Sequence, residues 1–311
     1  MPTRAPAGSK RKQVSRATTW DKVFAVTAFL AILAGALILS WYLHRPAVKQ
    51  FPDTIELRYA DFMSSIPSGV AHFRMLNITE ILTKSGGSEL IGGTALVSLL
   101  SPLINVTSGE VEWAVDIEDE QGAVVNVLGM DDDAAIRLVD LLNRSALSTE
   151  EIAGFRAYRV WTANKTWALV AMVDRALVYF EESTATGPMK RVLGAISANE
   201  TRMFDNEAVK RAYYLATLEA PLLGFSLTDF TSLPVTEVEV DWMFSFARYD
   251  GSNVDRTDVF ELNSQQLAID KFDKAKPLYF MNAQSQYIIG SFIVAGHIYP
   301  LEDLRTVILS L

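Results

Sequence analysis

Residues 23–43 read VFAVTAFLAILAGALILSWYL, a run of 21 residues without a charge. At about 1.5 Å per residue, a helix of this length covers roughly the 30 Å hydrocarbon thickness of a bilayer. Trp20 precedes the run, and Trp41 and Tyr42 close it, at the positions where aromatic side chains settle at lipid–water boundaries. The stretch therefore predicts one transmembrane helix, with the lipid bilayer as partner of residues 23–43.

The N-terminal flank predicts the orientation of this helix. It carries one acidic residue, Asp21, and six basic ones: Arg4, Lys10, Arg11, Lys12, Arg16 and Lys22. By the positive-inside rule, residues 1–22 form a cytoplasmic basic tail and the remainder lies outside the cytoplasm of a single-pass cell-membrane protein. A cleaved signal peptide is the alternative, with Ala34 to Ala36 as its small-residue site. The apolar run continues to Leu43, which favours an uncleaved signal-anchor.

Composition excludes several kinds of function. From residue 46 onward there are 21 Lys and Arg against 36 Asp and Glu, a formal charge of −15. Such a surface repels phosphate backbones, so we expect no nucleic-acid partner. The chain has no cysteine, which excludes disulfides, thiol catalysis and cysteine-ligated metals. About half of the 311 residues are hydrophobic, enough for a packed core of one or two domains.

Five glycosylation triplets agree with an exported domain. They place acceptor asparagines at Asn77, Asn105, Asn143, Asn164 and Asn199, each followed two residues later by Ser or Thr. Glycans require surface positions, and all five triplets fall near expected ends of helices or strands. No triplet occurs after residue 201. We therefore predict a glycoprotein whose C-terminal half is bare, and a protein partner on that half is a hypothesis.

The pattern beyond the membrane segment predicts an α+β ectodomain. Val111, Trp113, Val115 and Ile117 alternate with less apolar residues, as in a half-buried strand. The order strand, hairpin, helix, hairpin, helix occurs twice after a linker at 44–66, in units at 67–200 and 201–311. This order predicts antiparallel sheets with helices packed on one face, and an internal duplication.

Several elements of this prediction are specific enough to be tested. Asp131 to Asp133 predict the start of a helix whose apolar face is Ile136, Val139 and Leu142. Asp174 and Arg175 predict a tight turn. Helices are expected at residues 79–104, with breaks at glycines, and at 265–272. A hairpin is expected between strands 278–283 and 287–297.

No arrangement of residues predicts a catalytic, cofactor or metal site. His44, His72 and His297 lack metal-ligand spacing, and no phosphate loop or nucleophile motif occurs. Two acidic groups offer oxygen ligands of the kind that calcium prefers: Asp131 to Asp133, and Asp250 with Asn253, Asp255 and Asp258. A helix cap in the first and a hairpin turn in the second are sufficient explanations. Glu237, Glu239 and Asp241 resemble a paired-carboxylate site, but a solvated strand face is a sufficient explanation for them.

These observations together favour a membrane-anchored cell-envelope glycoprotein that acts by binding or scaffolding, without enzymatic activity. Two alternatives stay open. The first is an accessory subunit of a larger membrane complex, docked through the bare C-terminal half. The second is an extracytoplasmic hydrolase whose carboxylates meet only in the fold, for which two facing Asp or Glu side chains with perturbed pKa would be the sign.

Overall fold

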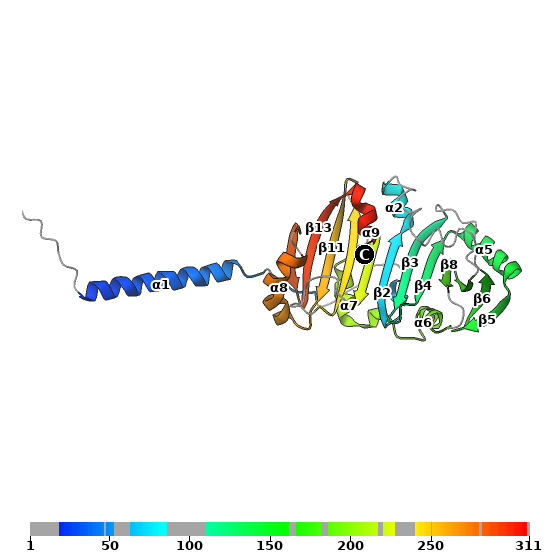
Figure 1. Cartoon of the computed structure of the whole chain (residues 1–311), viewed down its shortest axis with the longest axis horizontal. Helices are drawn as coiled ribbons and strands as arrows, with labels where there is room; N and C mark the ends of the chain where they lie inside the picture. Colours follow the sequence, from blue (N-terminus) through cyan, green and yellow to red (C-terminus); the bar gives the residue numbers. More distant parts are fainter. Residues whose placement is uncertain are drawn as a thin grey trace, which may run out of the picture. The chain divides into compact units, whose positions relative to one another are not determined.

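A computed structural model describes residues 19–46, 48–52, 63–85, 110–161, 166–181, 186–216, 220–227, 240–249, 251–279 and 282–309 (Figure 1). The chain divides into two compact units, residues 1–46 and residues 47–311. Two of the predicted acceptors, Asn105 and Asn164, lie outside the described residues, as do Asp250, Glu237 and Glu239. The same holds for the predicted helix beyond Ser85.

The first unit consists of one helix, α1 (Thr19–Leu43). Its residues Lys22–Leu43 are long and apolar enough to cross a membrane, and none of that window is buried inside the structure. The hydroxyl of Thr27 donates to the carbonyl of Val23 at 2.9 Å, so this polar group is satisfied within the helix. The guanidinium of Arg45 lies 3.7 Å from the centre of the Trp41 ring. The helix is therefore apolar on all sides, and Trp41 and Arg45 form an aromatic and cationic group at its C-terminal end.

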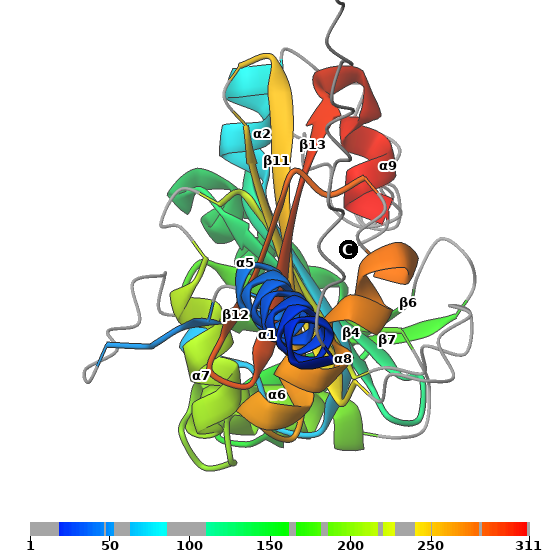
Figure 2. The same ribbon diagram turned by 90° about the vertical axis from the view of Figure 1, so that its left-hand side faces the viewer.

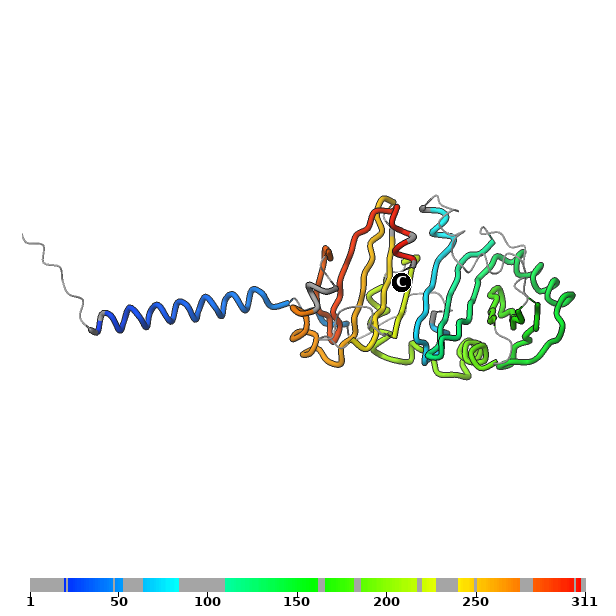
Figure 3. Tube along the Cα trace, in the orientation of Figure 1, coloured from blue at the N-terminus to red at the C-terminus, as the bar shows by residue number. Residues whose placement is uncertain are grey.

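The described residues of the second unit form a 13-stranded sheet, and Figure 3 shows the Cα trace running along its strands. The strands are β1 (Val48–Lys49), β2 (Val70–Asn77), β3 (Val111–Asp119), β4 (Val124–Met130), β5 (Ser148–Ile152), β6 (Phe155–Trp161), β7 (Trp167–Val173), β8 (Ala176–Phe180), β9 (Leu222–Leu227), β10 (Trp242–Tyr249), β11 (Asn253–Glu261), β12 (Ser285–Ile289) and β13 (Phe292–Pro300).

Their order in the sheet is β1-β12-β13-β11-β10-β9-β2-β3-β4-β8-β7-β6-β5. Every neighbouring pair is antiparallel except β1 with β12, which is parallel. The two meanders β2-β3-β4 and β9-β10-β11 meet through the antiparallel pair β2 and β9. On each side of this centre, the chain leaves the meander, forms a helix and further strands, and places the last of these strands beside the meander. This last strand is β8 beside β4 on one side and β13 beside β11 on the other. The expectation of separate sheets is therefore replaced by one continuous sheet.

The helices are α2 (Ile78–Ser85), α5 (Asp132–Ser145), α6 (Gly187–Ile196), α7 (Glu207–Tyr214), α8 (Gln265–Tyr279) and α9 (Leu304–Leu309). Short 3-10 turns occur at η1 (Met63–Ser65), η2 (Met203–Asp205) and η4 (Leu301–Asp303). The turn η2 leads into α7, and η4 leads into α9 directly after Pro300.

Helices cover both faces of the sheet, so the expectation of helices on one face is wrong. Residues of α6 and α7, such as Leu193 and Val209, share a buried cluster with Phe73 and Phe244. Residues of α2, α5 and α9 pack in a second cluster on the opposite face. Figure 2 shows α7 on one side of the sheet and α8 and α9 on the other. The physical reason is that the strands are apolar on both faces, and each apolar face must be covered.

We call the two sides the α7 face and the α9 face. One row of paired residues on the α7 face is apolar across ten strands: Leu169, Phe180, Val125, Ile117, Phe73, Phe225, Phe244, Val259, Val294 and Tyr287. The rings of Phe73 and Phe225 stack at 5.8 Å between centroids. This row holds the centre of the domain together.

Three local predictions need correction. In α5 the buried residues are Ala134, Ala135, Leu138 and Leu142, whereas Ile136 is exposed, because the two alanines let a neighbouring stripe of the helix approach the sheet. Residues 278 and 279 end helix α8, and the last hairpin pairs β12 with β13 around Gly290. Gly290 has a φ of +56°, which a two-residue turn with glycine first requires.

Candidate functional site

The α9 face carries a row of polar residues behind the apolar row of the α7 face, on the opposite side of the same strands. Cross-strand pairing aligns Asn126, Asp116, Arg74, Gly224, Ser245, Asp258, Ala295 and Gln286 on strands β4, β3, β2, β9, β10, β11, β13 and β12. We call this set the polar row. Polar side chains in the middle of a covered sheet need partners, and two groups of partners are present.

The first group is a network around Asp258. Its carboxylate accepts a hydrogen bond from the Ser245 hydroxyl at 2.5 Å and from Arg256 Nε at 2.8 Å. Ser245, Arg256 and Asp258 are all buried. Nε2 of His297, on the neighbouring strand β13, lies 3.9 Å from Asp258 Oδ2. The buried carboxylate of Asp258 and the buried guanidinium of Arg256 therefore balance each other's charge on the α9 face.

The order of groups in this network decides its chemistry. In a nucleophilic triad, histidine stands between the serine and the carboxylate and removes the serine proton. Here Asp258 stands between Ser245 and His297, because β11 separates β10 from β13. Burial lowers the pKa of His297, against the opposite effect of Asp258. The arrangement is that of a structural charge network.

The second group is the ion pair of Arg74 and Asp116, with Arg74 Nη2 and Asp116 Oδ2 at 2.6 Å. Arg74 Nη1 also donates to the carbonyl of Ile308 in α9 at 3.4 Å, which joins β2 to the C-terminal helix. Desolvation by burial raises the pKa of Asp116 in spite of the neighbouring guanidinium. Arg74 Nε and Asp116 Oδ1 are buried without a hydrogen-bond partner. This pair stabilises less than a fully bonded one would.

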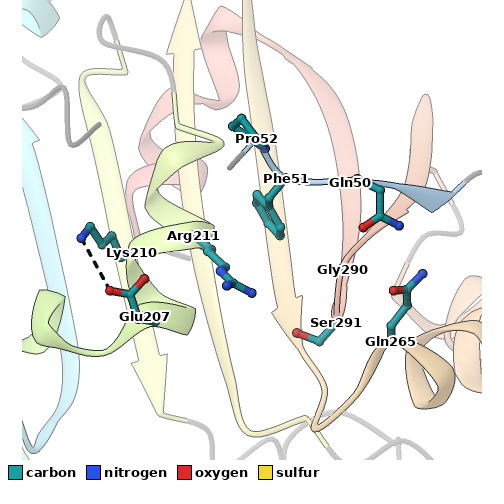
Figure 4. Close-up of a pocket in the computed structure, with 9 residues that line it drawn as sticks. All are labelled: Gln50, Phe51, Pro52, Glu207, Lys210, Arg211, Gln265, Gly290 and Ser291. Carbon is teal, nitrogen blue, oxygen red and sulfur yellow. Dashed lines mark ion pairs between the residues drawn. The ribbon is translucent and has the colours of Figure 1, made fainter. Parts of the chain in front are cut away.

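An open cleft of about 640 Å³ lies beside the β12–β13 turn (Figure 4). It is bordered by Gln50, Phe51 and Pro52 after β1, Glu207, Lys210 and Arg211 of α7, Gln265 of α8, and the turn residues Gly290 and Ser291. The lining is mostly polar, and its formal charge is +1, because two cations face one carboxylate. This sign is opposite to that of the domain as a whole.

Phe51 fixes the shape of the cleft. Its ring meets Phe292 edge-on at 5.6 Å between centroids, and it packs so closely on Gly290 that a Cβ there would lie 3.1 Å from the ring. The guanidinium of Arg211 lies 5.9 Å from the centre of the same ring. Lys210 Nζ pairs with Glu207 at 3.6 Å. For Arg211 the described structure gives this ring contact and no carboxylate partner.

A pair of carboxyl groups occurs elsewhere, at Asp241 and Glu261. Burial, together with a hydrogen bond and repulsion from Asp241, raises the pKa of Glu261 to about 7. Glu261 therefore holds its proton to a higher pH than a free glutamic acid does. Neither residue lines the cleft. The sequence pattern offers Asp241 as one member of a carboxylate pair, but it does not indicate Glu261, which comes from another strand.

The three described acceptor asparagines lie at ends of elements. Asn143 and Asn199 are exposed, in the last turn of α5 and after α6. Asn77 is half-buried at the end of β2, where its side-chain oxygen accepts from the Glu80 backbone N–H at 3.1 Å. Use of any of the five triplets stays a prediction.

The acidic residues weighed for calcium do not converge on one point among the described residues. Asp255 pairs with Arg248 at 3.4 Å. Asp258 lies three residues further on, on the opposite face of β11, within its own network. Asp131 caps α5 as predicted, accepting from the Ala134 N–H at 2.7 Å. In the part of the chain that the structure describes, no three His, Asp or Glu side chains gather around a common point.

Comparison with known proteins gives similarity of structure only. No protein-family model matches the chain, and no curated protein matches it by sequence. Two solved structures of TP0453, in crystal forms I and III, are similar to it. Both have a TM-score of 0.47, with 12% and 14% identity, covering 81% of this chain and 97% and 99% of the TP0453 chain. The described residues themselves show a mixed fold of helices and strands with a large sheet and one candidate membrane helix.

Proposed function

We propose that this protein is a single-pass membrane protein whose domain of residues 47–311 lies outside the cytoplasm and works by binding or scaffolding. The observation that carries the proposal is α1. An apolar helix of this length with no residue of its window buried has its whole surface available to lipid. Its N-terminal flank is basic, and Trp41 and Arg45 suit the far boundary of the bilayer.

The absence of cysteine gives a direct test of this orientation. Single cysteines replace Ser9 in the basic tail and Glu120 in the exposed turn between β3 and β4. Intact cells are then treated with a membrane-impermeant maleimide. We expect labelling of Glu120→Cys on intact cells and of Ser9→Cys only after lysis. The reverse pattern, or a mature chain that begins after Ala36, would refute the proposal.

We further propose that exposed triplets carry glycans. Asn143 and Asn199 are the described sites that support this best, since both are exposed. The side-chain oxygen of Asn143 accepts from the Tyr158 hydroxyl at 3.0 Å, so its amide nitrogen stays available as the acceptor atom. Mass spectrometry of the native protein, beside Asn143→Gln and Asn199→Gln, tests the idea. Unmodified asparagines at both positions would reject it.

An internal duplication is the explanation we propose for the mirrored strand order. Each half has a three-stranded meander, then a helix, then further strands, the last of which lies beside the meander. The half at 67–200 has four strands after its helix, and the half at 201–311 has two. Sequence profiles built separately for the two halves should match each other, and profiles without any match would count against common origin.

Binding, rather than catalysis, is supported by the order of groups around Asp258 and by the position of Asp241 and Glu261 away from the cleft. The half without acceptor triplets also carries most of the cleft lining. A docking partner on that half, as in an accessory subunit, is tested by co-purification in mild detergent. A single stoichiometric membrane partner is the expected result, and purification of the protein alone speaks against that role.

A further inference from the structure

We propose that the cleft bordered by Phe51 and Arg211 binds the phosphate group of a lipid headgroup at the membrane surface. This inference rests on the proposed function, because it requires the domain to lie at the lipid surface. It goes further by naming the ligand class and the residues that hold it.

The charges of the cleft select an anion. Lys210 and Arg211 provide two cations, and Glu207 offsets one of them through its contact with Lys210 at 3.6 Å. Arg211 has a described ring contact and no described carboxylate, so its guanidinium can take a bidentate oxyanion. A divalent cation would find a single carboxylate there, already paired with a lysine.

The neutral groups of the cleft also suit a phosphate ester. Gln50, Gln265 and Ser291 line it with two carboxamides and a hydroxyl, which can donate to oxyanions or to the hydroxyls of a headgroup. Gln265 is the first residue of α8, so the positive end of that helix borders the cleft. Phe51 and Pro52 are the apolar side chains, too few to bury an acyl chain. Figure 4 shows Arg211 reaching into the space beside Phe51.

The length of chain between the membrane helix and the cleft identifies the source of the phosphate. α1 ends at Leu43, and Gln50 lines the cleft. The seven residues from His44 to Gln50 span at most about 25 Å, whatever path they take. Val48 and Lys49 are fixed to the domain by pairing with β12, and Lys49 Nζ lies 3.7 Å from the centre of the Tyr287 ring. If α1 spans the bilayer as proposed, this length limits how far Gln50 can lie from the lipid headgroups.

The test uses the full chain in a non-ionic detergent. Calorimetric titration with dioctanoyl phosphatidylglycerol measures its affinity, and glycerol 3-phosphate and inorganic phosphate are titrated in the same way. We expect Arg211→Gln to weaken binding of the lipid at least tenfold, and Lys210→Gln to weaken it less, because Lys210 already has a carboxylate. Arg144→Gln, the same charge change at an exposed helix end, should alter the affinity less than twofold.

Three results would overturn the inference. The first is equal lipid binding by wild type and Arg211→Gln. The second is an equal loss in Arg144→Gln, which would mean that only the total charge matters. The third is glycerol 3-phosphate or inorganic phosphate binding as tightly as the lipid, which would assign the cleft to a soluble anion. Because α1 need not span a bilayer in this assay, its outcome is independent of the cysteine-labelling test.

Discussion

Removal of the Asp258 carboxylate should be among the most damaging single changes in the domain. Asp258→Ala leaves the guanidinium of Arg256, which is 8% exposed, without its counter-charge, and takes the acceptor from the Ser245 hydroxyl. Breaking one side of a buried ion pair typically costs about 3–5 kcal/mol. Arg256→Met should cost less, because Asp258 keeps the hydrogen bond from Ser245. The double variant removes both charges and should recover about 2 kcal/mol of the sum of the single effects.

Urea unfolding of the full chain in non-ionic detergent measures these free energies, followed by tryptophan fluorescence, to which the buried Trp242 on β10 contributes. Asp140→Ala is the matched control. Asp140 is an exposed carboxylate in α5, 3.8 Å from Arg144, and its loss should cost less than about 0.5 kcal/mol. A cost below about 1 kcal/mol for Asp258→Ala, or strictly additive single and double variants, would refute the view that the network neutralises buried charge.

Two further predictions concern the sheet. The pKa of Glu261 is about 7 in the folded protein against 4.5 for the free group, so its contribution to stability is complete below about pH 4.5 and is lost as pH rises through 7. Glu261→Gln should reduce this loss of stability by about 1 kcal/mol, a small value because solvent reaches the side chain. An unchanged pH profile of urea unfolding in the variant would contradict the assignment. Gly129→Ala should cost about 1–3 kcal/mol, since its Cβ would lie 2.0 Å from the Trp113 ring; an unaltered unfolding midpoint would show that Trp113 moves aside freely.

The features that could be predicted from the sequence are those set by neighbouring residues. The strand predicted at Val111 to Ile117 is confirmed as β3, although a register shift places Val111 on the opposite face from Val115 and Ile117. Asp174 adopts a φ of +54° in the predicted turn. Asp131 caps α5 because an aspartate before a helix accepts from the exposed backbone N–H groups of its first turn. Each of these outcomes depends on contacts within a few residues.

Strand β5 shows where such local reasoning fails. Ser148–Ile152 is short, charged and largely exposed, so it lacks the apolar alternation of a covered strand. It is specified instead by the turn at Ala153 and Gly154, whose φ angles of +52° and +85° suit a two-residue hairpin turn. Pairing with β6 at the edge of the sheet then supplies its hydrogen bonds. An edge strand of this kind is charged because charge prevents further strand addition.

The candidate sites could not be predicted because they are made by register and by distant segments. Arg74, Ser245 and Asp258 look like ordinary exposed polar residues of alternating strands. Only the pairing of β2 with β9, 150 residues later in the chain, brings them onto one row. The cleft likewise joins residues that follow the anchor to α7, α8 and the β12–β13 turn.

The distribution of charge connects these two observations. The domain carries a formal charge of −15, and the buried Arg256 and the partly buried Arg74 each pair with a carboxylate. Repulsion between an acidic domain and anionic lipid would hold the two apart, unless cations collect where the tether forces them together. Lys49, Lys210 and Arg211 collect at that end of the domain, beside the edge strand that continues from α1. Under the proposed lipid binding, the positive cleft gives an otherwise acidic domain a place at which to meet lipid phosphates.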